Sequence, residues 1–166
     1  MKYAVEVKRP EGISNARALV SGAAKQIRSG RYHGGSIVVD LTDCIEIPVE
    51  CGVTSGEPDL SPLNEQLIGG LKDLHRQIFD DSSSRIKERR DHVFSLVGFA
   101  RHVHWNKDDL AVPRLGRAVA TIEYQRGGPN TLKARRAKWL GRLVHDGIKG
   151  SGHSQTAEMN VSDLLE

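Results

Sequence analysis

Hydrophobic and polar residues alternate along residues 3–8, which predicts a strand with Glu6 and Lys8 on the same face. Apolar side chains then recur every three or four positions, which predicts a helix over residues 13–30. A β-branched run predicts a second strand over residues 36–41. A strand, a helix and a strand within forty residues predict a right-handed parallel crossover.

The second half of the chain continues the mixture of helices and strands. Leucines on one helical stripe predict a helix that begins near Ser61. Residues 93–105 predict a strand, and residues 118–124 predict its sheet neighbour across a connection at 106–117. Residues 131–148 predict a third helix. The side chains available to pack this helix are Leu132, Trp139, Leu140, Leu143 and Ile148.

These elements predict one α/β domain over residues 1–148, built as a mixed β-sheet with flanking helices. The chain has 166 residues, of which 38% are hydrophobic and 27% charged, which suits a globular protein with a single core. Residues 149–166 are small and polar, and we expect them to form a disordered C-terminal tail.

Charge and cysteine content narrow the class of protein. Lys and Arg number 24 against 21 Asp and Glu, a net charge of +3 that identifies no partner by itself. The charged N-terminus is unlike a signal peptide, and no apolar run approaches the roughly 18 residues that a membrane span requires. Cys44 and Cys51 lack a CxxC spacing and are too few for a disulfide scaffold. We therefore expect a cytoplasmic protein with reduced thiols.

Glu6 and Lys8 are the most informative residues, because they lie inside an apolar strand that leads directly into a helix. Their backbones lie about 7 Å apart on one strand face. A carboxylate and an ammonium placed so can share one phosphate, the carboxylate through a divalent cation and the ammonium directly. The plainer interpretation is an edge strand whose polar face meets water, because matches this short are common.

The strand in AVEVKRPEG, the helix after it and the strand in SIVVDL together resemble the PD-(D/E)XK nuclease superfamily, whose members share a restriction-endonuclease-like core. The resemblance covers about residues 3–41. It implies a partial core of this kind, in which Glu6 binds Mg²⁺ or Mn²⁺ and Lys8 assists hydrolysis of DNA. Gln26 matches a helix glutamine that some branches of the family place near the active site.

The family also places a metal-binding Asp upstream of this strand, whereas five residues precede Glu6 here. Three explanations follow: a fragment of a longer nuclease, a degenerate nuclease that keeps the fold for binding, or a substitute carboxylate. Asp40, late on the neighbouring strand, is the candidate substitute and would bind the metal with Glu6. A solvated carboxylate at a strand end is the plainer interpretation of Asp40.

Two further sets of residues could bind ligands. His102 and His104 stand two apart, so on a strand their imidazoles face the same side and could share a metal, although zinc sites normally need three or four ligands. The third helix is rich in cations that could follow a nucleic-acid backbone, or could form a solvated helix face. These cations are Lys133, Arg135, Arg136, Lys138 and Arg142.

The leading expectation is a nuclease-like domain that hydrolyses phosphodiester bonds of DNA with Mg²⁺ or Mn²⁺, or that derives from such an enzyme. The alternative is a catalytically inactive nuclease-like module that binds nucleic acid or a protein partner, as an inhibitor or accessory subunit. A third arrangement completes the active site across a homodimer.

Overall fold

The computed structural model describes residues 2–47, 53–55, 59–77, 92–124, 131–149 and 154–160. Its elements are β1 (Ala4–Lys8), α1 (Ile13–Ser29), β2 (Gly35–Asp40), β3 (Val53–Thr54), α2 (Ser61–His75), β4 (Val93–Asn106), β5 (Asp109–Glu123), α4 (Leu132–Lys149) and β6 (Ser154–Asn160). The predicted α/β class with a mixed sheet and flanking helices is confirmed. No helix in the described ranges combines the length and the apolar character that crossing a bilayer demands.

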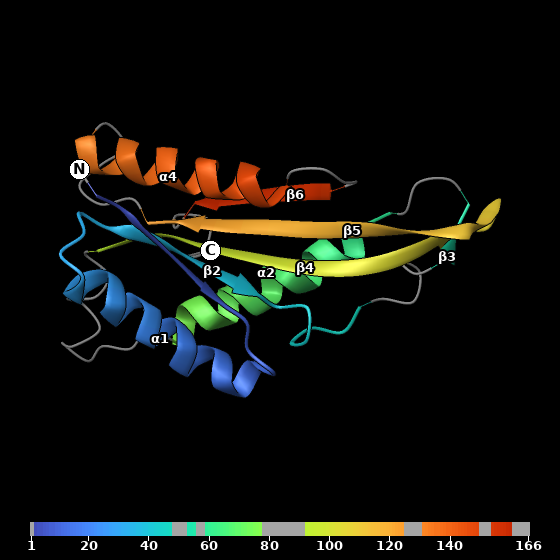
Figure 1. Cartoon of the computed structure of the whole chain (residues 1–166), viewed down its shortest axis with the longest axis horizontal. Coiled ribbons are helices and arrows are strands. Elements are labelled where there is room, and N and C mark those ends of the chain that lie inside the picture. The colour runs from blue at the N-terminus through green and yellow to red at the C-terminus, as the bar shows by residue number, and fades with distance from the viewer. Residues whose placement is uncertain are drawn as a thin grey trace.

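All strands belong to one sheet, in the order β1-β2-β4-β5-β6, with β3 added beside β4. β1, β2 and β4 run parallel, as the predicted crossover requires for the first two, and β5 is antiparallel to β4. β4 and β5 extend beyond the helices as a long arm, and β3 lies beside β4 near the end of this arm (Figure 1). β1 lies at one margin of the sheet.

Helices cover both faces of the sheet (Figure 1). α1 and α2 pack on one face and enclose the larger core, into which β2 points Ile37 and Val39. α4 packs on the other face, where Val38 of β2 contacts its C-terminal half. Because successive strand residues point to opposite faces, each position on β1 and β2 belongs to one of these two layers.

Small residues let the helices approach the sheet closely. α1 buries an almost continuous stripe of small and branched side chains: Ala16, Val20, Ala23, Ala24 and Ile27. α2 lies over Gly98 of β4, where an added Cβ would stand 3.0 Å from Leu71 Cδ1. An added Cβ at position 98 would therefore require Leu71 to shift by a few tenths of an ångström.

α4 forms where the sequence predicts a helix, but the predicted packing face is wrong for three of its residues. Leu132, Trp139 and Leu143 are more than half exposed. The buried stripe consists instead of Ala134, Ala137, Leu140, Gly141 and His145. The narrow side chains face the sheet because they permit a closer approach of helix and strands, which leaves the larger apolar groups on the outside.

Two segments differ from their predicted conformations. Most of the connection expected at 106–117 belongs to β5, which pairs with β4 as far as Asp109 opposite Asn106. The expected disordered tail includes β6, which pairs in parallel with β5. Both differences follow from ladder hydrogen bonding, since a long β4 and an unpaired margin of β5 each offer backbone groups to a neighbouring segment.

Candidate functional site

The side chains of Glu6, Lys8 and Gln26 converge at the margin of the sheet. Ala4, Glu6 and Lys8 project toward the α1 layer, as the burial of Ala4 in the larger core shows. Lys8 Nζ donates to Glu6 Oε2 at 3.2 Å and to Gln26 Oε1 at 3.1 Å. The three residues that the sequence singled out on the strand and the helix therefore form one cluster.

The crossover holds this cluster in place. β1 is in parallel register with β2, with Glu6 opposite Ile37 and Lys8 opposite Val39. Gln26 immediately precedes Ile27, whose buried side chain anchors the end of α1 in the larger core. The side chains of Lys8 and Glu6 remain 20% and 28% exposed, so the cluster lies at the surface. Within the described residues the Glu6 contact uses Oε2, which leaves Oε1 available to a cation or a donor.

Asp40 lies on the opposite side of the sheet from Glu6. It shares its face of β2 with Val38, which packs in the α4 layer, and it lines a groove together with Val5 and Val7. The structure therefore does not bring Asp40 together with Glu6. The reason is the register, since Glu6 is level with Ile37 and Asp40 falls on the alternate set of β2 residues.

Asp40 is instead enclosed by donors. Its Oδ2 accepts from Arg101 Nη2 at 2.8 Å, and its Oδ1 accepts from the Thr42 backbone N–H at 3.1 Å and the Thr42 hydroxyl at 2.5 Å. Arg9 Nε stands 3.9 Å from the same carboxylate. Such a set of donors satisfies a nearly buried carboxylate within the protein and leaves little of it for a metal.

The sequence analysis missed the partners of Asp40. Thr42 follows Asp40 by two positions, the spacing at which an Asp side chain commonly accepts from the backbone at the end of a strand. Arg101 is distant in sequence and reaches Asp40 because Phe99 of β4 is level with Asp40. The first contact has a local sequence signal, whereas the second depends on how β2 and β4 align.

The Glu6 cluster offers a divalent cation one carboxylate ligand, that of Glu6. Across the described ranges, no three His, Cys, Asp or Glu side chains gather closely enough to hold a metal ion. Mg²⁺ is commonly held through one or two carboxylates, with phosphate oxygens and water completing its shell. Glu6 fits the lower limit of that requirement, provided that a bound phosphate supplies further oxygens.

A groove runs between α4 and the α4-facing side of β1, β2 and β4. It encloses about 490 Å³ and is walled by apolar side chains, among them Val5, Val7 and Phe99, with Arg101 and Arg117 at its polar end. Arg117 Nη1 donates to the backbone carbonyl of Ile148 at 2.8 Å. That contact ties the end of α4 to the sheet and gives Arg117 a structural role.

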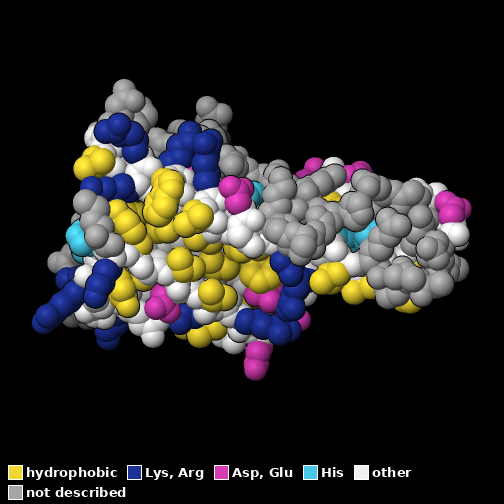
Figure 2. Space-filling view, turned by 45° about the horizontal axis from the view of Figure 1, so that its top comes forward, with side chains coloured by type: hydrophobic (Ala, Val, Ile, Leu, Met, Phe, Trp, Pro, Cys, Tyr) yellow, Lys and Arg dark blue, Asp and Glu magenta, His cyan; other side chains and the backbone are white. Residues whose placement is uncertain are grey.

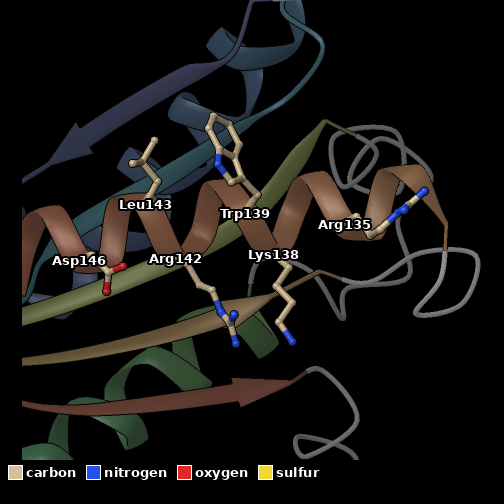
Figure 3. A pocket seen from close by; sticks show the side chains of 6 residues that line it. All are labelled: Arg135, Lys138, Trp139, Arg142, Leu143 and Asp146. Atoms are coloured by element: carbon tan, nitrogen blue, oxygen red, sulfur yellow. The ribbon is translucent and has the colours of Figure 1, made fainter.

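The predicted cations of α4 lie along its length. Arg135, Lys138 and Arg142 are exposed, Arg136 is half-buried, and Lys133 belongs to the same helix. Figure 3 shows Lys138 and Arg142 pointing to one side of α4, and Trp139 and Leu143 pointing to the other. The outward surface of α4 thus combines positive charge with an exposed indole and carries one carboxylate, Asp146.

His102 and His104 share a strand face, as predicted, and their rings stack with centroids 5.6 Å apart. Both are buried. The ring of His102 lies over Gly116 of β5, where an added Cβ would stand 1.9 Å from its Cε1. Burial lowers the pKa of His102 below its ordinary value, the neighbouring His104 lowers it further, and the Gly116 backbone partly opposes both effects. Stacked imidazoles that are buried in a closed strand pair are more consistent with packing than with metal binding.

Of the two cysteines, Cys44 lies in the described part of the chain as a free, half-buried thiol, and Cys51 falls outside it. Burial raises the pKa of the Cys44 thiol, and the carboxylates of Asp43 and Asp40 raise it further. Cys44 is therefore a poor nucleophile.

Comparisons with models of protein families, with curated proteins and with solved structures found no match to this chain. The resemblance to the PD-(D/E)XK superfamily therefore depends on the residues of the first crossover alone.

Proposed function

We propose that the chain is a nuclease-like domain with a partial restriction-endonuclease-like core, and that it acts on phosphodiester bonds of DNA through Glu6, Lys8 and Gln26. The observation that carries the proposal is the position of Lys8 Nζ, within 3.2 Å of Glu6 and 3.1 Å of Gln26 at the surface. Two residues on one strand and one on the following helix converge, as the nuclease interpretation of the sequence requires.

Lys8 places a positive charge where a phosphate would meet β1. Its ammonium has three donors, of which Glu6 and Gln26 take two, so that one remains for a phosphate oxygen. Gln26 fixes the direction of the lysine and adds no charge of its own. Lys8 would therefore bind the phosphate and stabilise the charge that develops on it during in-line attack.

Glu6 would hold a divalent cation, Mg²⁺ or Mn²⁺, together with oxygens of the phosphate and water. When bound, such a cation neutralises phosphate charge and lowers the pKa of a water molecule. Glu6 would exchange part of its contact with Lys8 for the cation, since both use the carboxylate. The interaction it gives up is an ion pair at the surface, which is weak.

Cleavage of single- and double-stranded DNA in Mg²⁺ and in Mn²⁺ tests the proposal. We expect the wild-type chain to cleave, and Glu6→Gln, which keeps the shape and removes the charge, to lose at least tenfold in rate. Glu11→Gln is the matched control, because Glu11 is exposed in the turn after β1 and lies outside the cluster. Titration of Mn²⁺ into the wild-type protein and both variants reports metal binding independently of turnover.

A wild-type protein that does not cleave DNA, or a Glu6→Gln variant as active as wild type, would overturn this function. Wild-type protein that binds Mn²⁺ no more tightly than Glu6→Gln would remove Glu6 as a metal ligand.

A second candidate, a module that binds nucleic acid without cleaving it, is favoured by the surface of α4. There the exposed cations Arg135, Lys138 and Arg142 accompany Trp139, whose indole is 55% exposed. Cations release counterions from phosphates, and an exposed indole offers a face to an unpaired base. This surface lies on the opposite layer from Glu6 and Lys8, so it does not depend on the catalytic proposal.

Salt dependence of DNA binding tests the second candidate. We expect Arg135→Ala/Lys138→Ala to reduce the slope of log K against log salt by about 2, because each lost phosphate contact contributes about 0.9. Arg17→Ala/Lys25→Ala removes the same charge from exposed positions on α1 and should leave the slope unchanged. Equal slopes for the two double variants would exclude α4 as the binding surface.

A further inference from the structure

The outer margin of β1 presents unpaired backbone groups. The Ala4 N–H donates to the Gly34 carbonyl on the β2 side at 3.1 Å. N–H and C=O groups alternate in direction along a strand, so Glu6 and Lys8 also face β2, whereas Val5 and Val7 face outward. In the described part of the chain β1 pairs with β2 alone.

Exposed apolar side chains accompany this open margin on the α4 side. Val5 and Val7 are 49% and 63% exposed, and Trp139 and Leu143 of α4 are 55% and 54% exposed. Hydrophobic side chains gather in the middle of this side of the molecule (Figure 2). An unpaired strand edge beside exposed apolar groups is a surface on which another strand can add.

The sequence of β1 is complementary to itself in one antiparallel register. If Val7 pairs with Val7 of a second copy, the outward backbone groups of both strands meet, with Val5 opposite Arg9. Glu6 of each strand then stands opposite Lys8 of the other, in a non-hydrogen-bonded pair where side chains approach most closely. The result is an alternating arrangement of two carboxylates and two ammonium groups on one face, with the two Val7 side chains in contact on the other.

The neighbouring registers that satisfy the backbone are less favourable. A shift that pairs Val5 with Val7 places Glu6 directly opposite Glu6, and like charges in that position are destabilising. A shift that pairs Val5 with Val5 places Glu6 opposite Ala4 and leaves both lysines without an opposing carboxylate. Charge complementarity therefore selects the register centred on Val7.

We propose that two copies of this chain associate through antiparallel pairing of β1 with β1 about a twofold axis at Val7, which joins the two sheets into one. The interface is isologous, as a twofold axis requires. A lysine on an edge strand normally opposes pairing with another strand because it is charged. In this register, however, Lys8 lies opposite the Glu6 carboxylate of the second copy. The association does not require catalysis, but it uses the side chains of Glu6 and Lys8, which the proposed nuclease site also uses.

Disulfide trapping tests the register directly. In a Cys44→Ser/Cys51→Ser background, Val7→Cys places two thiols in a hydrogen-bonded pair, where Cα atoms lie about 5.5 Å apart, within reach of a disulfide. Val5→Cys is the matched control on the same face, and its two copies would lie more than about 13 Å apart. We expect oxidation to yield covalent dimer for Val7→Cys and monomer for Val5→Cys, both with the circular dichroism of the parent.

Sedimentation of the unoxidised chain supplies a second readout. We expect a dimer for wild type, monomer for Glu6→Lys, in which like charges oppose one another, and restored dimer for Glu6→Lys/Lys8→Glu, in which the opposite charges are exchanged. A wild-type monomer at every concentration, cross-linking through Val5→Cys in place of Val7→Cys, or a double charge exchange that stays monomeric would overturn the proposal. These readouts register association alone, so loss of DNA cleavage cannot be mistaken for their failure.

Discussion

Glu6 and Asp40 are carboxylates on adjacent parallel strands, yet their environments have little in common. Glu6 is 28% exposed and contacts Lys8 through one oxygen. Asp40 is 7% exposed, and both of its oxygens accept hydrogen bonds, from Arg101 and from Thr42. The first is open to a ligand, and the second is enclosed within the protein.

The contrast shows that residues on opposite faces of the same sheet can take different roles, one in ligand binding and the other in holding the fold together. Glu6 lies in the middle of β1 and Asp40 at the C-terminal end of β2, and their positions in the sequence left open whether they share one site. The register places them on different layers, one beside α1 and one beneath α4. Asp40 then holds β4 and the turn after β2 together, while Glu6 is left for chemistry at the surface.

The largest effect that this contrast predicts is on stability. Asp40→Ala should lower the free energy of unfolding by about 2–3 kcal/mol, because it leaves Arg101 and Thr42 without their acceptor. The figure is below that of a fully buried pair, since the Arg101 side chain is 34% exposed and can partly rehydrate. Urea unfolding followed by circular dichroism measures the change.

Glu6→Ala is the comparison variant. Its ion pair with Lys8 lies at the surface, where such pairs contribute about 0–1 kcal/mol. We expect its unfolding midpoint to remain close to that of wild type. If Glu6→Ala destabilised the protein as much as Asp40→Ala, the Glu6 cluster would be a structural ion pair and the contrast between the two sites would disappear.

Much of the first crossover could be predicted from the sequence, because its signals are local. The alternation that makes β1 and the apolar period that makes α1 each lie within a few residues, and both elements form as predicted. The grouping of Glu6 with Lys8 follows from the same alternation. Gln26 came from the resemblance to the nuclease superfamily and not from a local signal, and the structure places its Oε1 3.1 Å from Lys8 Nζ.

The relative phase of β1 and β2 could not be predicted, because it depends on contacts between strands. Gly35 fits against Ala4, where an added Cβ would stand 2.5 Å from the Ala4 carbonyl oxygen, and this close approach helps to fix the register. The register in turn places Asp40 away from Glu6. The buried face of α4 could not be predicted either, because apolar residues are distributed all around the helix. Only its contact with the sheet determines that Ala134 and Ala137 are buried.

The smallest effect concerns the field of the two carboxylates near Cys44. Asp43 forms an exposed ion pair with Arg9, and Asp40 forms a nearly buried one with Arg101. Burial raises the pKa of the Cys44 thiol first, followed by Asp43 and then by Asp40. Because the thiolate is the reactive form, Asp43→Asn should lower that pKa and speed alkylation by iodoacetamide about two- to threefold below the pKa. Asp40→Asn should have less effect, because Asp40 raises that pKa less than Asp43 does. Arg101 offsets the Asp40 charge in a nearly buried pair, whereas the Arg9–Asp43 pair is exposed to water. Alkylation rates measured across pH in a Cys51→Ser background report the change. A larger acceleration from Asp40→Asn than from Asp43→Asn would mean that Arg101 does not neutralise Asp40 as the geometry indicates.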